Sequence, residues 1–491
     1  MAVWRDTGAA RRTTALLAAA ALASTTALAA CSADPEPGPR STTPASASPS
    51  SSQPAAPTII TFSLYGPAAV VAAYTKIAAD FTAAHPDIVV NVRPFNQHDP
   101  ELAALDGEQD PDVFMAERAD LAPLTEEELI QPVDQLLAEQ GVDFGDGFQR
   151  EALEAFSADA SLQCMPVDAS PLVVYYNKRL VDLTRLSAEG ERPVTADNGW
   201  GLQKFTLAAQ QAARGRVKGI YVEPTLKELA PFIWSGGGEL VDDQKAPTTL
   251  TLSSDDTVQA LEPLLELVRN PRLTFSEKQL RHTSPVRLFK AGRLAMLLGY
   301  RELTPLLRQQ QNLEFDVMPL PREGRRVTTG DMNALCISGD TEHAKAAAKF
   351  IAYSVTDEPT ALLASTGYVT PTNLDIANSD AFLQADQLPT DAEVFTNAMR
   401  YIEPMPSGPA WPQVHALAHR MLNRLFYDPV IDPLEQRLAV IDERSAEIFA
   451  RFAPPSESPS ESPSESSSES PSESPSESPS QSPSESPSQS G

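Results

Sequence analysis

The sequence predicts an α/β protein whose open sheets are covered by helices. Two observations support this class, and a third bears on the number of domains. Short β-rich runs alternate with amphipathic helical patterns along almost 400 residues, from 58 to 453. The first such pattern, strand–helix–strand over 58–95, implies a parallel pair of strands with a right-handed crossover. The stretch is too long for a single core, so two domains are expected.

The expected elements begin at Thr58. The run "TIITFSLYGP" opens with a strand, and apolar residues from Val70 to Phe81 recur at helical spacing until Pro86 ends the helix. The runs "DIVVNVRPF" and "DPDVFMAE" predict further strands. Later helices are expected at 124–139 and 255–269, and later strands at 171–176, 218–222, 294–298, 315–318 and 333–338.

The N-terminus reads as an export signal. Residues 15–30 are apolar or small, about 16 in all, which is short of the roughly 20 needed to span a bilayer, and arginines precede them. The segment ends in Leu28-Ala29-Ala30-Cys31. This order resembles the bacterial lipoprotein signal, which implies a signal peptide over 1–30 and a lipid on Cys31. An ordinary cleaved signal peptide with a chance cysteine is the alternative.

Two segments lack the apolar content of a core. Residues 31–57 are rich in Ser, Pro, Thr and Ala and predict a flexible stalk. Residues 454–491 repeat Ser-Glu-Ser-Pro and predict a disordered, acidic tail, because regularly spaced prolines oppose helix and sheet. A solvated spacer is the simplest interpretation of this tail; contact with cell-wall polymer and modification of its serines are alternatives.

The net charge argues against two classes of partner. The formal charge is −28, and removing the seven glutamates of the tail and the net +2 of residues 1–30 leaves about −23. A charge of this size argues against nucleic acid and anionic lipid as partners, because both need basic patches. No nucleic-acid partner is therefore expected.

Motifs for catalysis are missing from the sequence. It contains no Gly-x-Ser-x-Gly elbow, P-loop, Gly-x-Gly-x-x-Gly or Ser-x-x-Lys box. His415 and His419 have the i, i+4 spacing of zinc peptidases, but Ala416 stands where those enzymes carry a glutamate. The sequence therefore predicts no enzyme, no catalytic residue, no metal ion and no cofactor.

Several segments resemble one known family. They are "PDVFMAERADLAPLTEEELIQPVDQLL", "CMPVDASPLVVYYNKRLV", "FIWSGGGELVDD" and "ALCISGDTEHAKAAAKFIAYSVTDEPTALLASTGYVTPT". Together they are similar to family 1 of the bacterial extracellular solute-binding proteins, the group that contains maltose-binding protein. The resemblance spans nearly all of 58–453 and implies a two-lobed periplasmic-binding-protein fold, type II-like, with hinge strands and a ligand cleft between the lobes.

The resemblance also implies a function. The chain would be a monomeric receptor, lipid-anchored on the outer face of the cell membrane, that delivers a solute to the permease of an ABC importer. The solute would be a carbohydrate. A non-sugar solute such as a polyamine or a peptide, and a ligand-free envelope lipoprotein of the same fold, are the alternatives.

The resemblance divides the globular part between the two lobes. The first lobe would comprise 58–164 and the return segment 335–382. The second would comprise 165–334 and the C-terminal helices in 383–453.

Residues at or near the ends of predicted strands are expected to meet the ligand, because open α/β sheets bind ligands at the carboxyl ends of their strands. The matched segments and strand ends give this set: Tyr65, Glu117, Arg118, Asp168, Glu223, Trp234, Tyr300, Arg301 and Trp411.

Several of these assignments have alternatives. Trp411 matches a tryptophan that stacks on sugar rings, whereas core packing is an equal alternative for Trp234. Glu117 and Arg118 could instead form a surface pair, and Asp168 a hinge hydrogen bond. Met115 stands where the maltose binder has a tryptophan, which indicates a smaller or different sugar, or a non-sugar solute.

Cys164 and Cys336 lie on the two segments that resemble hinge strands. Neighbouring strands lie about 4.8 Å apart, within the range of Cα separations that a disulfide needs. The pair is therefore a disulfide candidate in an oxidising compartment, and two separate buried thiols are the alternative.

Overall fold

The computed structural model describes residues 56–103, 105 and 110–453. The predicted signal peptide, Cys31, all but the last two residues of the stalk, and the Ser-Glu-Ser-Pro tail lie outside these residues. Among the helices described, none combines the length and apolar character needed to cross a membrane.

In the described part of the chain, the first sheet has six strands in the order β2-β1-β3-β12-β4, with β7 also paired to β12. Strand β1 runs parallel to β2 and β3, as the strand–helix–strand pattern predicts, and β12 runs antiparallel to its neighbours. The strands are β1 (Thr58–Tyr65), β2 (Ile88–Phe95), β3 (Val113–Glu117), β4 (Ile130–Gln131), β7 (Cys164–Pro171) and β12 (Gly330–Ser338).

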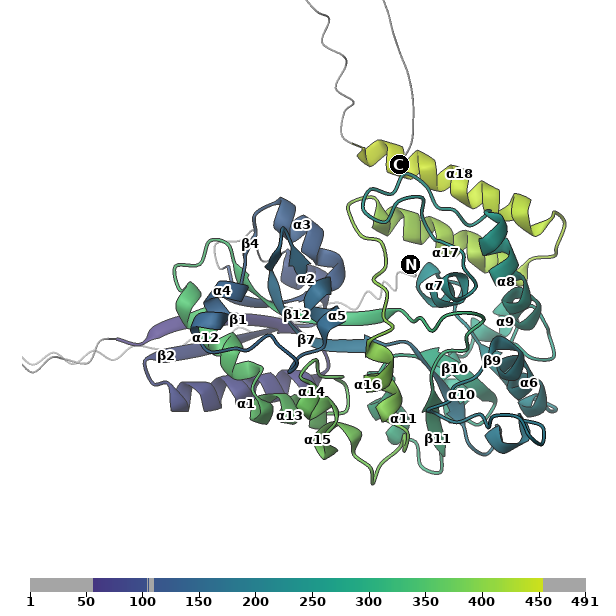
Figure 1. The fold of residues 1–491 in the computed structure, drawn as a ribbon, viewed down its shortest axis with the longest axis horizontal. Coiled ribbons are helices and arrows are strands. Elements are labelled where there is room, and N and C mark those ends of the chain that lie inside the picture. Colours follow the sequence, from purple (N-terminus) through teal and green to yellow (C-terminus); the bar gives the residue numbers. More distant parts are fainter. Residues whose placement is uncertain (1–55, 104, 106–109, 454–491) are drawn as a thin grey trace, which may run out of the picture. The chain divides into compact units, whose positions relative to one another are not determined.

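Helices pack on this sheet around one hydrophobic core (Figure 1). They are α1 (Ala68–Ala84), α2 (His98–Leu102), α3 (Leu121–Glu126), α4 (Asp134–Glu139), α5 (Arg150–Ala155), α12 (Ala344–Ser354) and α13 (Asp357–Ser365), with the 3₁₀ turn η1 (Arg118–Asp120) after β3. A small hairpin of β5 (Ser157–Ala158) and β6 (Ser161–Leu162) precedes β7.

The single helix expected at 124–139 is wrong. The chain forms α3, then the short strand β4, then α4. Glu128 adopts a left-handed backbone with φ of +57°, which ends the helical run. Pro132, which cannot donate a backbone hydrogen bond, follows the pairing of Ile130 and Gln131 with β12. A periodic apolar pattern did not reveal this break.

The second sheet has four strands in the order β11-β8-β10-β9 within the described residues. Strand β10 is antiparallel to β8 and parallel to β9. The strands are β8 (Val173–Asn177), β9 (Lys218–Tyr221), β10 (Leu294–Gly299) and β11 (Phe315–Met318), all close to the expected positions.

Both faces of this sheet are covered, because alternate side chains of β8 enter different cores. Val174 and Tyr176 join one core, and Val173 and Tyr175 join the other. Around the first core pack η2 (Leu183–Arg185), α6 (Leu202–Ala212), α7 (Leu226–Ser235), α8 (Asp255–Val268), α17 (Trp411–Tyr427) and α18 (Leu434–Phe452). Around the second pack α9 (Glu277–Leu280), α10 (Pro285–Lys290), α11 (Leu303–Arg308), α14 (Leu374–Ala377), α15 (Asp380–Leu383) and α16 (Glu393–Met399). These open, covered sheets confirm the α/β class.

Strands β7 and β12 link the two sheets. They lie side by side in Figure 1, and each belongs to the first sheet while one of its ends continues toward the second. Their register shifts between Asn333 and Ala334, where Asn333 pairs with Asp168 and Ala334 with Pro166. Such a bulge bends a strand and redirects its side chains. The bulge therefore fixes where Asp168 and Asn333 point.

Cys164 and Cys336 form a disulfide at the end of this strand pair that lies within the first sheet. The two residues are register partners with a Cα–Cα distance of 4.4 Å, and both are fully buried in the hydrophobic core of the first sheet. The bridge therefore joins β7 to β12 inside the first sheet.

Candidate ligand-binding site

A cavity of about 630 Å³ lies beside β7 and β12, where these strands run from the first sheet toward the second. Its volume is in the range of small-molecule sites. The first sheet and its loops contribute Tyr65, Gly66, Pro67, Val70, Tyr74, Met115, Glu117, Arg118, Ala119, Val167, Asp168, Gly330, Asp331, Met332, Asn333, Tyr368 and Val369. The second sheet's helices and loops contribute Lys227, Glu302, Pro404, Met405, Pro406, Trp411, Pro412 and His415.

A chain of hydrogen bonds runs along the first wall of the cavity. The Tyr65 hydroxyl, at the end of β1, donates toward Asn333 Oδ1 at 2.8 Å and Glu117 Oε1 at 3.0 Å. Asn333 in turn donates from Nδ2 to Asp168 Oδ2 at 3.3 Å. The second oxygen of Asp168 accepts the Thr370 N–H at 2.7 Å. Four strands, β1, β3, β7 and β12, thus hold one polar surface.

Gly66 lets the chain turn into the cavity directly after Tyr65. Its φ of +136° lies in a region that residues with a side chain rarely adopt. The turn allows α1 to begin at Ala68, so β1 ends with Tyr65 at the cavity wall.

The turn η1 presents Glu117 and Arg118. Asp120 Oδ2 accepts the Glu117 N–H at 2.7 Å and holds the turn closed. Within the described residues, the side chain of Arg118 has no hydrogen bond or ion pair, and its Nε is buried. The Arg118 guanidinium is therefore available to a solute.

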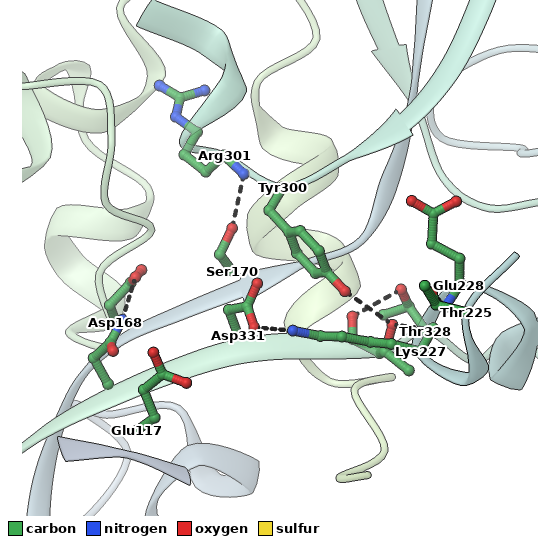
Figure 2. A network of polar contacts seen from close by, with 12 residues as sticks. Glu117, Asp168, Ser170, Thr225, Lys227, Glu228, Tyr300, Arg301, Thr328 and Asp331 are labelled. Atoms are coloured by element: carbon green, nitrogen blue, oxygen red, sulfur yellow. Dashed lines mark hydrogen bonds and ion pairs between the residues drawn. The ribbon is translucent and has the colours of Figure 1, made fainter. Parts of the chain in front are cut away.

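The opposite wall is built around Lys227 at the start of α7. Its ammonium forms an ion pair with Asp331 of β12 and lies 4.8 Å from the centre of the Tyr300 ring, as Figure 2 shows. Thr329 donates to the Lys227 carbonyl at 3.0 Å and lies 3.4 Å from the Tyr300 hydroxyl. The Thr225 side chain accepts the Glu228 N–H and caps the helix at this end.

The start of α17 supplies an aromatic edge. Trp411 is the first residue of the helix, and His415 follows one turn later, so both face the cavity. Burial, and then the charges of His419 and Lys227, lower the pKa of His415, which keeps the imidazole neutral at pH 7. A neutral imidazole can both donate and accept a hydrogen bond.

Carboxylates outnumber cations in the lining. Burial raises the pKa of Asp168 to about 8, although the bonds from Thr370 and Asn333 oppose this shift. Burial, followed by the charge of Asp331, raises the pKa of Glu302, whose side chain has no partner among the described residues. Burial lowers the pKa of Arg118. Within the described residues, Glu302 and Arg118 are thus ionisable groups without a partner, one on each wall.

The structure brings together part of the set predicted from sequence. The residues that line the cavity are Tyr65, Glu117, Arg118, Asp168 and Trp411. Asp168 also makes the hinge hydrogen bonds that were the alternative interpretation.

The remaining predicted residues lie outside the lining. Arg301 is fully buried: its guanidinium stacks on Phe382 and points away from Glu117 and Asp331 (Figure 2). Trp234 is buried in the core around α7. Glu223 is exposed, and Tyr300 reaches the site only through its contact with Lys227.

Sequence reasoning missed several lining residues, although two left a signal. His415 lies four residues after Trp411 on one helix face, and Glu302 directly follows the predicted pair Tyr300-Arg301. Lys227 and Asp331 left no signal, because their contact joins residues 104 apart in the chain.

The cavity offers hydrogen-bond donors, acceptors and an aromatic surface from both sides. This combination suits a polar solute with an apolar face. The described residues contain no cluster of His, Cys, Asp or Glu able to hold a metal ion.

Comparisons with known proteins agree with this architecture. A sequence model described as bacterial extracellular solute-binding protein matches residues 76–390. Among solved structures, an ABC substrate-binding protein of Listeria monocytogenes in complex with cycloalternan is 21% identical, with a TM-score of 0.66 over 81% of this chain and 99% of that one.

Two further solved structures are similar. The maltose-binding periplasmic protein of Listeria monocytogenes in complex with maltose is 17% identical, with a TM-score of 0.63 over 79% of this chain and 98% of that one. The sugar-binding protein MalE of Xanthomonas citri is 15% identical, with a TM-score of 0.69 over 80% of this chain and 98% of that one. These likenesses confirm the expected two-lobed fold.

Proposed function

The chain belongs to the bacterial extracellular solute-binding proteins, and from this premise we propose that it is the lipid-anchored saccharide receptor of an ABC importer. The observation that carries the proposal is the cavity, in which hydrogen-bonding side chains and Trp411 converge from the two sheets. Hydroxyl groups bind well to charged partners such as Arg118 and Glu117, and a sugar ring offers an apolar face to an indole.

The names of the similar structures support the solute class. They include complexes with cycloalternan and with maltose, and the fold of this chain is like theirs. A solute that contacts both walls would favour the closed arrangement of the lobes, which would then dock on the permease.

A titration of the purified chain with its stalk and without lipid tests the solute class. Maltose, maltotriose and cyclic glucans would be compared by calorimetry and thermal shift. A saccharide at 100 times its Kd adds about 2.7 kcal/mol to the free energy of unfolding. Absence of any shift with every saccharide would contradict the proposal.

The excess of carboxylates favours a second candidate, a cationic solute such as a polyamine. Glu117, Glu302 and Asp331 face only Arg118 and Lys227 in the lining, and Asp168, with its pKa of about 8, adds a carboxyl group that is largely protonated at pH 7. Glu302→Gln separates the two candidates. The variant should weaken spermidine binding strongly and reduce its salt dependence, whereas affinity for a neutral saccharide should change by less than about threefold.

Anchoring is tested separately at Cys31. Cys31→Ala should release the protein into the medium or leave its signal peptide uncleaved, because the acyl acceptor is lost. A processed variant that stays with the membrane would refute the anchor.

A further inference from the structure

His98 lies beneath the cavity wall without lining it. It opens α2, and its Nε2 lies 2.7 Å from Asp120 Oδ2. The same oxygen accepts the Glu117 N–H, also at 2.7 Å. One carboxylate oxygen therefore ties the His98 ring to the turn that presents Glu117 and Arg118.

The ring of His98 also supports Tyr65. The two rings meet edge to face with centroids 5.1 Å apart. The Tyr65 hydroxyl lies at the cavity, bonded to Glu117 and Asn333. His98 thus contacts both Tyr65, which lines the cavity, and Asp120, which holds the turn that carries Glu117 and Arg118.

Among the described residues, the groups that face His98 include Asp120 from η1, Glu117 from β3, Tyr65 from β1 and Glu101 from its own helix, all of them acidic or phenolic. Burial of the ring lowers the pKa of His98, but the bond with Asp120 and the charges of Asp120, Glu117 and Glu101 outweigh it and raise the pKa to about 9. The ring is therefore an imidazolium at pH 7, paired with a largely buried carboxylate.

We propose that His98 is a positioning residue for the binding wall: by holding Asp120 and the Tyr65 ring, it fixes Glu117 and Arg118 for the solute, and its charge makes affinity depend on pH. This inference rests on the proposed solute-binding function, because it assigns a role at the same cavity. The charge-assisted bond is stronger than a neutral one, so its loss should loosen the turn.

The sign of the pH effect follows from the raised pKa of His98. Its contact with Asp120 stabilises the fold fully below about pH 6.5, the ordinary pKa of histidine, and this contribution is lost as the pH rises through about 9. Solute affinity should fall over the same upper range. Glu101 and Asp168, with pKa values raised by burial to about 7 and about 8, titrate at lower pH, so the His98 contribution is read from variants.

Three variants separate position from charge. His98→Gln keeps an N–H donor for Asp120 but cannot titrate, and His98→Leu removes the donor. His85→Leu is the matched control, because the His85 ring also packs on an aromatic ring, that of Phe81 at 4.8 Å, and does not line the cavity. His98→Asn, whose amide is too short to replace Nε2, substitutes for His98→Leu if that variant does not fold.

Hydrogen–deuterium exchange of the ligand-free proteins at pH 7 tests positioning. In His98→Leu, the peptide that contains Glu117–Asp120 should exchange at least about tenfold faster than in wild type, as expected when one charge-assisted hydrogen bond is lost. In His85→Leu, its exchange rate should equal that of wild type. Equal exchange in wild type and His98→Leu would overturn the positioning role. This readout needs no solute.

Titration with maltose from pH 6 to 10 tests the consequence for binding. At pH 7 the Kd should rise about fivefold in His98→Leu and less than about twofold in His98→Gln, the scale of one hydrogen bond. Between pH 8 and 10 wild type should lose affinity more steeply than His98→Gln. Parallel pH profiles would overturn the charge effect. Failure of wild type to bind maltose or any other saccharide would instead count against the proposed function, and the exchange measurement would still decide the role of His98.

Discussion

Replacing both Cys164 and Cys336 by alanine should lower the free energy of unfolding by about 2–5 kcal/mol. The disulfide joins positions 172 apart in the sequence. In the chain-entropy model, a loop of this length restricts the unfolded chain by about 5 kcal/mol at 25 °C, which is an upper figure because unfolded chains retain some structure. The closed loop includes the whole second sheet, so the bridge restricts most of the protein.

Guanidinium unfolding measures this loss. Oxidised wild type, wild type in dithiothreitol and the double variant would be compared at pH 7. The last two should unfold at the same lower concentration of denaturant, and maltose affinity should stay unchanged because neither cysteine lines the cavity. Equal midpoints for the double variant and the oxidised wild type, or two reactive thiols in denatured, unreduced Cys31→Ala protein, would refute the reasoning.

Three further predictions concern the cavity, the core and the tail. Trp411→Ala should weaken saccharide binding by about 1–3 kcal/mol with the unfolding midpoint kept, and unchanged affinity in calorimetry would remove Trp411 from the site. Arg301→Ala should cost about 2–4 kcal/mol in denaturant unfolding, because its buried guanidinium stacks on Phe382 at 4.5 Å and Phe395 at 5.2 Å; a large loss of affinity in the folded variant would contradict a purely structural role. Truncation after Ala453 should change the melting temperature by no more than about two degrees, since the tail has no apolar residue to bury; a larger loss in calorimetry would mean that it packs on the fold.

Part of the first wall of the cavity was predictable, because two of its residues stand at strand ends. Tyr65 and Glu117 end β1 and β3, and strands that lie parallel in one sheet bring their carboxyl ends together. Alternation and helical spacing place such elements from sequence alone. The break at Glu128 was not predictable, because a left-handed residue of this type has no strong local signature.

Which residues line the second wall is determined by how far along its helix or strand each side chain lies. Lys227 and Trp234 are seven residues apart and so share one face of α7, but Trp234 lies about 10 Å further along the axis. Lys227 reaches the cavity, and Trp234 enters the core. In the same way, the turn after β10 sends Arg301 into the core and Glu302 into the cavity. Neither spacing nor composition contains this information.

Strand β12 connects the two polar walls through one of its faces. Asp331 and Asn333 are two residues apart, so their side chains leave the strand on the same side. Asp331 pairs with Lys227 of the second wall, and Asn333 bonds to Tyr65 and Asp168 of the first. A solute that contacts both walls would thus act on residues whose partners are Asp331 and Asn333, two residues apart on β12 and next to the register shift at Ala334. Any preference of the solute for one lobe arrangement must come from the difference between its contacts with these walls in the two states, since a ligand shifts a conformational equilibrium only by its differential affinity.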